Sequence, residues 1–262
     1  MSGGRVGVNL VAAVDLVDYA QFGLGKDRAP EAIAKGVGRT PEERYAMADE
    51  YATLLKYLWT SDDAIDFEGE YFQAYGAHVD PKPTSSPRPI LMNAAGSELG
   101  IDFATRQCDA IFVSPGQAGP KGWEQQAKDI KAAAASHGRK VRICMMCFVV
   151  MDETDEKAAE TVQWLGDEID AEAVVNQFRR LSGSASSSSW GIDDVNDEHL
   201  RKFGLGLGGY QVFGSYKTVA DTLASMHSAG VDEVALFFWD PARSVEAFGK
   251  HVMPLLEERG LR

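Results

Sequence analysis

Short apolar runs alternate along the chain with longer stretches in which apolar residues recur every three or four positions. Continuous apolar runs bounded by turn residues or charges are typical of strands covered on both faces, as in parallel sheets. Five segments have this pattern. We therefore expect strands at 5–11, 89–94, 110–113, 141–150 and 233–239.

The stretches between these runs predict helices. The first has a well-marked start, because Thr40 can cap the helix, Pro41 suits the first turn and Glu43 completes a capping box. Strands that alternate with helices indicate βα units and a mostly parallel sheet, so we expect an α/β fold in a single domain over 1–262. The predicted helices are 40–59, 98–107, 121–137, 154–180, 217–229 and 243–258.

Two stretches lack regular periodicity. Residues 66–89 contain Gly69 and four prolines, which predicts a long loop with a short hairpin. Residues 182–190 are rich in serine. A long loop inside a compact domain is either a binding loop or lid or a plain surface insertion, and the sequence leaves both readings open.

The composition narrows the class of protein. With 45% hydrophobic and 25% charged residues, the chain has the balance of a globular protein. The net charge of −13 disfavours nucleic acid as a partner, because an acidic surface repels phosphate backbones. We expect no membrane span, since no apolar run reaches about 18 residues, and no signal peptide at the N-terminus.

Three cysteines are too few for a disulfide framework, so we expect a reducing, cytoplasmic setting. Cys144 and Cys147 form a C-x-x-C motif, but they lie in a predicted strand, where side chains at this spacing point to opposite faces. A redox pair of this kind needs a helix N-terminus. We therefore expect the two thiols to be core residues.

Several motifs occur in an order typical of one family. They are Ser-Gly-Gly-Arg-Val-Gly-Val-Asn-Leu at 2–10, Arg-Tyr at 44–45 with Leu-Leu-Lys-Tyr-Leu-Trp at 54–59, Phe-Glu-Gly-Glu-Tyr-Phe at 67–72, Ala-Ala-Gly-Ser-Glu-Leu-Gly at 94–100, and the segments 212–220 and 230–239. Together they resemble the bacterial luciferase-like, flavin-dependent monooxygenases, nearest to their pyrimidine and alkanesulfonate branches. The resemblance covers essentially the whole chain.

The resemblance implies a partial TIM (β/α)₈ barrel of about five parallel strands with outer helices. Members of the family carry three βα units before the Ser-Gly-Gly-Arg segment, whereas that segment directly follows Met1 here. We therefore expect the first three units of the barrel to be absent from this chain. In such barrels the site lies at the carboxyl ends of the strands.

The resemblance also implies the residues that bind the cofactor. Asn9 would contact the flavin ring, or it pairs only with loop backbone. Asp18 stands where the family has a glutamate, or is a solvated carboxylate. Arg44 and Tyr45 would hold the ribityl-phosphate portion of FMN, since a guanidinium can donate two parallel hydrogen bonds to phosphate. Otherwise they form a surface ion pair and a core aromatic.

Ser97 stands between a predicted strand and a predicted helix. The N–H groups of a helix N-terminus, with their partial positive charge, favour an anion. By resemblance Ser97 binds the FMN phosphate, and the alternative is an ordinary helix cap without a ligand. No histidine pair has the spacing of metal ligands, and we identify no catalytic residue.

The implied activity uses reduced FMN, supplied by a separate flavin reductase, and dioxygen to oxidise a small organic substrate of pyrimidine or sulfonate type. The chemistry belongs to the flavin, and the protein binds it and excludes water. Two alternatives remain. The chain could be a non-catalytic flavin-binding remnant, or a subunit that completes its barrel with another chain, because an open sheet edge favours homo-oligomers. It could also be a deazaflavin-dependent reductase.

Overall fold

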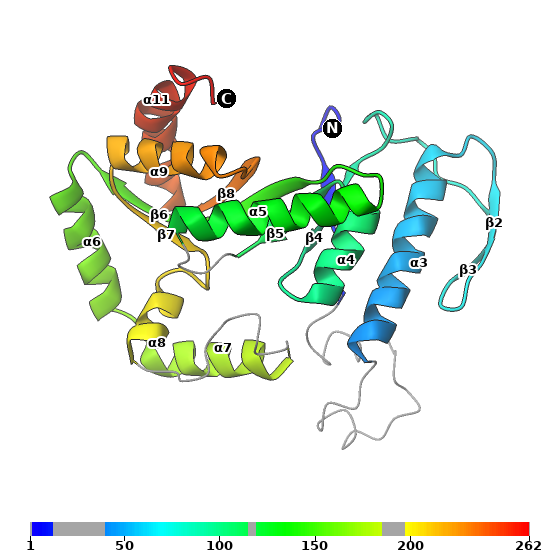
Figure 1. Cartoon of the computed structure of the whole chain (residues 1–262), viewed down its shortest axis with the longest axis horizontal. Coiled ribbons are helices and arrows are strands. Elements are labelled where there is room, and N and C mark those ends of the chain that lie inside the picture. Colours follow the sequence, from blue (N-terminus) through cyan, green and yellow to red (C-terminus); the bar gives the residue numbers. More distant parts are fainter. Residues whose placement is uncertain (1, 13–39, 115–118, 185–196, 262) are drawn as a thin grey trace. The chain divides into compact units, whose positions relative to one another are not determined.

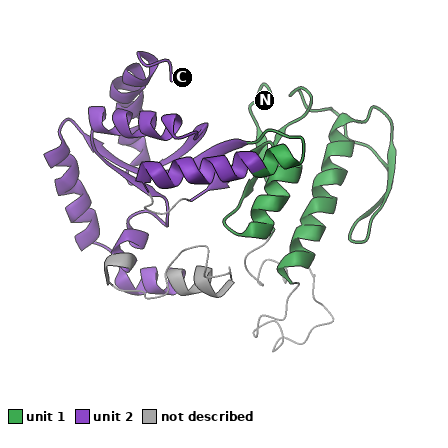
Figure 2. Cartoon of the chain, viewed as in Figure 1, with its two compact units in different colours: residues 1–111, 133–141 green, residues 112–132, 142–262 purple. Residues whose placement is uncertain are grey.

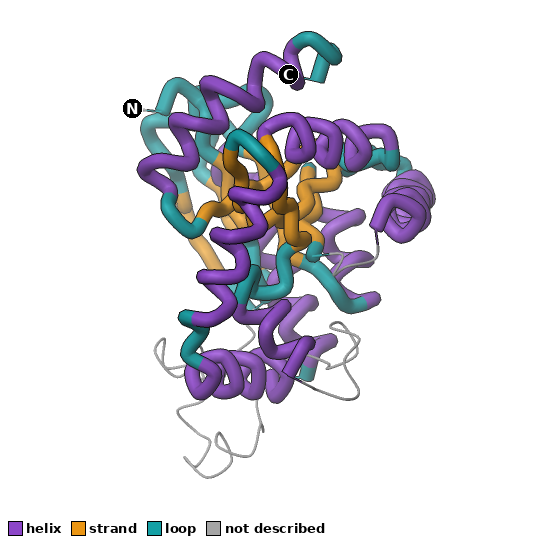
Figure 3. Tube along the Cα trace, turned by 90° about the vertical axis from the view of Figure 1, so that its left-hand side faces the viewer, coloured by secondary structure: helices purple, strands orange, loops and turns teal. Residues whose placement is uncertain are grey.

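The structure is a computed structural model that describes residues 2–12, 40–114, 119–184 and 197–261. Contacts between residues divide the chain into two compact units (Figure 2). The first contains residues 1–111 and 133–141, and the second contains residues 112–132 and 142–262. Figure 3 distinguishes the helices from the strands of the described residues by colour.

In the first unit, strands β1 and β4 pair in parallel, with Asn9 opposite Met92. Figure 1 labels β4 and the two helices α3 and α4 of this unit. The antiparallel hairpin of β2 and β3 lies between them in sequence. Leu91 and Phe103 are fully buried in this unit. Its elements are β1 (Gly7–Asn9), α3 (Pro41–Thr60), β2 (Ile65–Glu68), β3 (Gln73–Ala77), β4 (Ile90–Ala94) and α4 (Glu98–Gln107), and β5 (Ala110–Val113) spans the boundary.

In the second unit, β6 is a central strand that pairs in parallel with both β7 and β8. Cys147 lies opposite Tyr210 on one edge of β6 and opposite Leu236 on the other. The elements are α5 (Gly119–Ser136, whose last residues belong to the first unit), β6 (Arg142–Asp152), α6 (Asp155–Asp167), α7 (Ala171–Ser184), α8 (Asp197–Gly204), β7 (Tyr210–Ser215), α9 (Tyr216–Ser228), β8 (Glu233–Phe238), α10 (Pro241–Ala247), the π-helical turn η2 (Phe248–Val252) and α11 (Met253–Glu257).

The predicted start of α3 is confirmed. The Thr40 Oγ accepts a hydrogen bond from the Glu43 N–H at 3.2 Å, and the Glu43 carboxylate accepts one from the Thr40 N–H at 2.8 Å. Each bond satisfies an amide that has no acceptor within the helix. This capping box fixes the start of α3, close to Arg44 and Tyr45.

The α/β class, the parallel pairing and all five predicted strands are confirmed, and so is a hairpin within the long loop. The expected set lacked β7, which the sequence obscured because Gln211 interrupts its short apolar run and Gly214 and Ser215 end it. The predicted run of helix over 154–180 is wrong. Helix α6 ends at Asp167, and the Asp170 side chain then accepts from the Ala173 N–H at 3.0 Å and caps a second helix, α7.

The predicted helix over 243–258 is also interrupted, by the π-helical turn η2. The cysteines behave as expected. Cys108, Cys144 and Cys147 are all buried and free. The Cys147 Sγ lies 3.7 Å from the Met226 Sδ, inside the core of the second unit. No helix within the described ranges is both long enough and apolar enough to cross a membrane.

Candidate functional site

Ser97 caps the N-terminus of α4. Its Oγ accepts a hydrogen bond from the Gly100 N–H at 3.2 Å, and its carbonyl accepts from the Ile101 N–H at 2.9 Å. In the first turn of a helix the preceding amides, here those of Glu98 and Leu99, have no intrahelical acceptor. A hydroxyl that accepts from Gly100 still has its own hydrogen to donate. The turn after β4 is therefore rich in donors.

The hydroxyl of Tyr45 reaches this same turn from α3. A Cβ placed on Gly100 would lie 2.6 Å from the Tyr45 Oη and 3.3 Å from the Ser97 Oγ. The Tyr45 ring packs against the ring of Phe103 on α4, with centroids 5.7 Å apart. This contact keeps the Tyr45 side chain against α4. Two residues that are 52 positions apart in sequence thus bring hydroxyls to one point.

Helices α3 and α4 run in the same direction. Tyr45 meets Gly100 near the start of both helices, Asp49 accepts from Arg106 at 2.6 Å further along, and Lys56 donates to Gln107. Their N-termini therefore lie at one end of the pair. The N-terminus of α4 carries a partial positive charge and favours an anion, whereas the N-cap amide of α3 already donates to the Glu43 carboxylate.

Arg44 precedes Tyr45 on α3 and is half-buried. Its Nε is buried and has no hydrogen-bond partner among the residues that the structure describes. A buried donor without a partner costs free energy, on the order of 1–3 kcal/mol, which a bound acceptor would recover. This atom is the first of two buried, unpaired polar atoms near the predicted site.

Asn9 is exposed at the carboxyl end of β1. Because β1 and β4 are parallel, with Asn9 opposite Met92, Asn9 lies at the same sheet edge as the turn that carries Ser97. Asn93, which the sequence analysis missed, is fully buried beside it and donates from Nδ2 to the Leu10 carbonyl at 2.5 Å. Its Oδ1 has no partner within the described part of the chain.

Of the five residues implied by resemblance, the structure brings Tyr45 and Ser97 together, with Arg44 adjacent to Tyr45 on α3. Asn9 lies at the same strand edge. Asp18 lies outside the described residues. Sequence reasoning missed Asn93, although an amide inside an apolar strand was a usable signal, and it assigned no role to Gly100.

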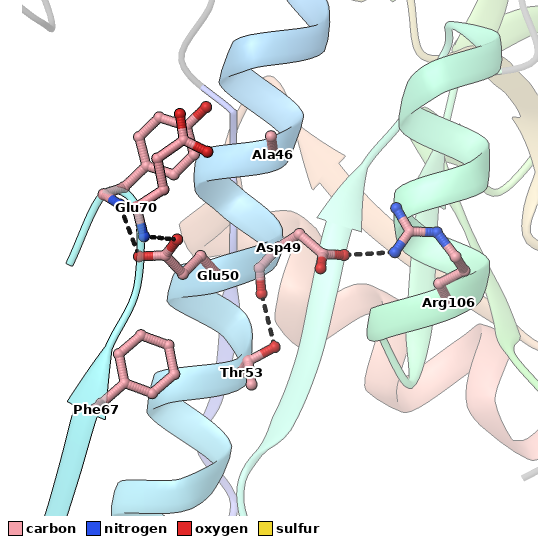
Figure 4. Close-up of a pocket in the computed structure, with 8 residues that line it drawn as sticks. Ala46, Asp49, Glu50, Thr53, Phe67, Glu70 and Arg106 are labelled. Carbon is pink, nitrogen blue, oxygen red and sulfur yellow. Dashed lines mark hydrogen bonds and ion pairs between the residues drawn. The ribbon is translucent and has the colours of Figure 1, made fainter. Parts of the chain in front are cut away.

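A separate open hollow of about 510 Å³ lies along α3, and none of the predicted site residues lines it (Figure 4). Figure 4 shows α3 between the segment that bears Phe67 and Glu70 and the helix that bears Arg106. Most of the polar side chains that line this hollow already form hydrogen bonds with each other or with their neighbours. Asp49, for example, accepts hydrogen bonds from Arg106 and from Gln107. We therefore do not assign the cofactor to this hollow.

Glu50 also lines that hollow, and its position accounts for Gly69, the glycine of the Phe-Glu-Gly-Glu-Tyr-Phe motif. Its carboxylate accepts hydrogen bonds from the N–H groups of Glu70, Tyr71 and Phe72 at 2.9, 2.9 and 2.6 Å. A Cβ on Gly69 would lie 2.1 Å from the Glu50 Oε1. Only glycine at this position leaves room for the carboxylate, which fastens the hairpin to α3.

The N-terminus of α9, at the end of β7, is a useful contrast. There Ser215 is the cap, and the Asp155 carboxylate accepts from the Ser215 N–H at 2.6 Å. This bond is the largest of the interactions that lower the pKa of Asp155. A protein carboxylate thus already occupies the anion position of α9. At α4, by comparison, the Ser97 Oγ pairs with the Gly100 amide, and the Glu98 side chain is exposed.

Comparison with known proteins adds to this geometry. The family described as luciferase-like monooxygenase matches residues 1–233. The chain is 33% identical over 267 residues to the pyrimidine monooxygenase RutA of Bradyrhizobium sp. strain BTAi1, covering 100% of this chain and 69% of that protein. It is 28% identical to an FMNH₂-dependent dimethylsulfone monooxygenase of Pseudomonas putida, covering 98% of this chain and 67% of the relative.

The fold agrees with solved structures. A riboflavin lyase (RcaE), crystallised with modified FMN and riboflavin, superposes with a TM-score of 0.77 at 24% identity over 99% of this chain and 65% of that one. DmoA from Hyphomicrobium sulfonivorans superposes with a TM-score of 0.70 at 21% identity over 97% of this chain and 68% of that one. The expected α/β fold, part of a luciferase-like TIM barrel, is thereby confirmed.

A parallel α/β fold whose polar residues gather at the carboxyl ends of its strands has the architecture of a barrel-type enzyme. More specifically, the chain belongs to the luciferase-like monooxygenase family. It spans about two thirds of the length of the relatives that it matches.

Proposed function

We propose that this chain binds reduced FMN and supports the flavin-dependent oxygenation of a small organic substrate. The observation that carries the proposal is the meeting of the Tyr45 and Ser97 hydroxyls at the N-terminus of α4. Relatives named for monooxygenase activity, one of them FMNH₂-dependent, support the assignment to this class of reaction.

The turn at Ser97 fits a phosphate monoester. Two hydroxyls, two first-turn amides that have no acceptor within the helix and the N-terminus of α4 all favour a dianion there. Glycine at position 100 keeps the space between the hydroxyls open. Tyr45 and Ser97 would therefore hold the phosphate of FMN.

Arg44 and Asn9 would extend this contact. The buried Nε of Arg44 needs an acceptor, and a phosphate or ribityl oxygen supplies one. Asn9 is exposed at the strand edge, where its amide can both donate to and accept from the rim of the flavin ring. Asp18 stays a proposed contact by resemblance alone.

When bound, reduced flavin supplies the activation of dioxygen and the transfer of one oxygen atom. The residues of this chain anchor and orient it. The hydroxyls, the amides and the guanidinium fix the phosphate end, and this binding energy positions the ring at the end of the strands without contributing to the oxygen chemistry. We assign no residue a catalytic role.

The substrate class that we propose is a small pyrimidine or sulfone-type molecule, by likeness to the named relatives. Reduced FMN would come from a separate flavin reductase, and the cytoplasmic setting expected from the sequence stays a prediction. The alternative of a flavin-binding subunit that completes its barrel with another chain is favoured by one observation. The residues Val6 and Val11, on either side of β1, are 57% and 52% exposed.

The test is to supply the purified chain with chemically reduced FMN and to measure dioxygen uptake with uracil and with dimethylsulfone. The proposal predicts substrate-dependent uptake and an oxygenated product for one of the two. Binding of FMN without product formation, in both the monomer and any oligomer, would instead support the non-catalytic subunit.

A further inference from the structure

Gly100 is a glycine that helix geometry does not require. It lies in the first turn of α4, it is buried, and its φ is outside the left-handed region. In such a position alanine is the better helix former, because glycine loses more conformational freedom on folding. The glycine therefore needs an explanation from its surroundings.

Its surroundings supply one. A Cβ on Gly100 would lie 2.6 Å from the Tyr45 Oη, closer than such atoms can approach, and 3.1 Å from the Ala95 Cβ. The atom nearest to this Cβ is the far end of the Tyr45 side chain, so the phenol, whose ring packs against Phe103, has to swing aside. An alanine at position 100 would therefore push the hydroxyl of Tyr45 away from Ser97.

We propose that Gly100 is the residue that makes the site selective for a phosphorylated flavin over its unphosphorylated form. By leaving room for the Tyr45 Oη beside the Ser97 Oγ, it lets two hydroxyls converge on one anion. Riboflavin has the same ring system as FMN but lacks the phosphate, so the loss of this convergence affects only FMN. This inference rests on the proposed function, because it concerns the same turn.

The contact between a Cβ at position 100 and the Tyr45 hydroxyl can be tested with a double-mutant cycle. The atom that would clash is the hydroxyl oxygen of Tyr45, and phenylalanine lacks that atom. In a Tyr45→Phe background, Gly100→Ala loses its closest contact, and the remaining ones are the Ala95 Cβ at 3.1 Å and the Ser97 Oγ at 3.3 Å. The effects of the two substitutions on FMN affinity are therefore strongly non-additive, whereas independent structural defects would add.

The experiment measures dissociation constants for FMN and for riboflavin by flavin fluorescence quenching. The proteins are the unmodified chain, Gly100→Ala, Tyr45→Phe and the double variant. Gly249→Ala is the matched control, since a Cβ there meets nothing within 4 Å. Thermal unfolding of each variant monitors the fold independently of flavin.

We expect Gly100→Ala to weaken FMN binding by about tenfold or more and to leave riboflavin binding unchanged within about twofold. Added to Tyr45→Phe, the same substitution changes FMN affinity by less than about twofold. If Gly100→Ala alone fails to fold, we expect the double variant to fold, because the 2.6 Å contact with the Tyr45 Oη is gone.

Equal loss of FMN and riboflavin affinity, or an equal loss in the Tyr45→Phe background, overturns the role of Gly100 while leaving the proposed function intact. Failure of both Gly100→Ala and the double variant to fold overturns it as well. If the unmodified chain binds neither flavin, the proposed function fails first and the selectivity of Gly100 fails with it.

Discussion

The side-chain amide of Asn93 donates to the Leu10 carbonyl at 2.5 Å, across the pair of strands that leads to the candidate site. Asn93 is fully buried, and its Oδ1 has no partner in the described ranges. Leu10 directly follows Asn9, and its N–H donates to the Met92 carbonyl at 2.7 Å. Asn93 thus fixes the end of the strand on which Asn9 is presented.

We predict that Asn93→Ala lowers the free energy of unfolding by about 2 kcal/mol, because it leaves the Leu10 carbonyl without a donor. Asn93→Asp costs more at neutral pH, since it buries a carboxylate next to a carbonyl. Burial raises the pKa of such a carboxyl, so this variant regains stability as the pH falls and the protonated group can donate. Urea unfolding at pH 5 and pH 7.5 measures both, and an Asp variant as stable as the unmodified chain at pH 7.5 would contradict the role of the amide.

Local signals in the sequence predict much of this fold. The capping box of Thr40 and Glu43 and the position of Ser97 before Glu98 mark the starts of α3 and α4, because these residues satisfy amides within their own helix turn. The break at Asp170 was not predicted, since the same acidic residue type also occurs within helices. Whether an aspartate caps a new helix or lies within a continuous one depends on tertiary packing.

The site was predicted residue by residue but not as an arrangement. The sequence places Tyr45 and Ser97 on separate helices, and only packing of α3 on α4 shows that their hydroxyls meet. The roles of Gly100 and Gly69 depend on side chains that are far away in sequence, Tyr45 and Glu50. Such long-range steric relationships leave no periodic or local signal.

A second prediction concerns the carboxylate of Glu50, which accepts from three successive amides of the hairpin segment. We predict that Glu50→Ala lowers the local opening free energy there by about 2 kcal/mol, so the amides of Tyr71 and Phe72 exchange with solvent roughly 30-fold faster. Gly69→Ala acts in the same direction, because its Cβ would meet the carboxylate. Glu70→Ala, which removes an exposed carboxylate nearby, is the control. If the amide exchange rates stay unchanged in Glu50→Ala, the Glu50 carboxylate does not hold the hairpin segment on α3.

A third prediction uses the ion pair of Arg88 and Asp109, whose closest atoms are 2.6 Å apart and whose side chains are 13% and 28% exposed. Burial raises the pKa of Asp109, but hydrogen bonds from Arg88 and from the Leu91 N–H, with the charges of Arg88 and Arg139, hold it below its ordinary value. A lowered pKa gives stability that is present above the unfolded pKa of about 3.9 and is lost as the pH falls through the folded pKa.

Asp109→Asn is therefore less stable than the unmodified chain by about 2 kcal/mol at pH 7, and the difference shrinks in acid. Chemical unfolding between pH 3 and pH 7 measures it. Asp62→Asn, an exposed carboxylate on the surface, serves as the control. Curves for Asp109→Asn and the unmodified chain that run parallel down to pH 3 would mean that the pair contributes nothing through Asp109 ionisation.

The thiols provide a fourth prediction. Burial raises the pKa of Cys108 and of Cys147 to about 12, and that of Cys144 to about 11. Since the thiolate is the reactive form, we predict that native protein at pH 8 reacts with a disulfide reagent at less than about a hundredth of the rate of free cysteine. Denaturant releases all three thiols. Rapid labelling of Cys144 or Cys147 in native protein would revive a redox role for the C-x-x-C motif.

The central claim is a phosphate-binding turn at Ser97, and titration of the chain with FMN tests it most directly. We predict saturable quenching of FMN fluorescence, with affinity about tenfold weaker in Ser97→Ala and in Tyr45→Phe. Ser215→Ala, which removes the equivalent cap of α9 where Asp155 already fills the anion position, leaves the affinity unchanged within about twofold. Absence of quenching by the unmodified chain, or equal losses in all three variants, would contradict the account.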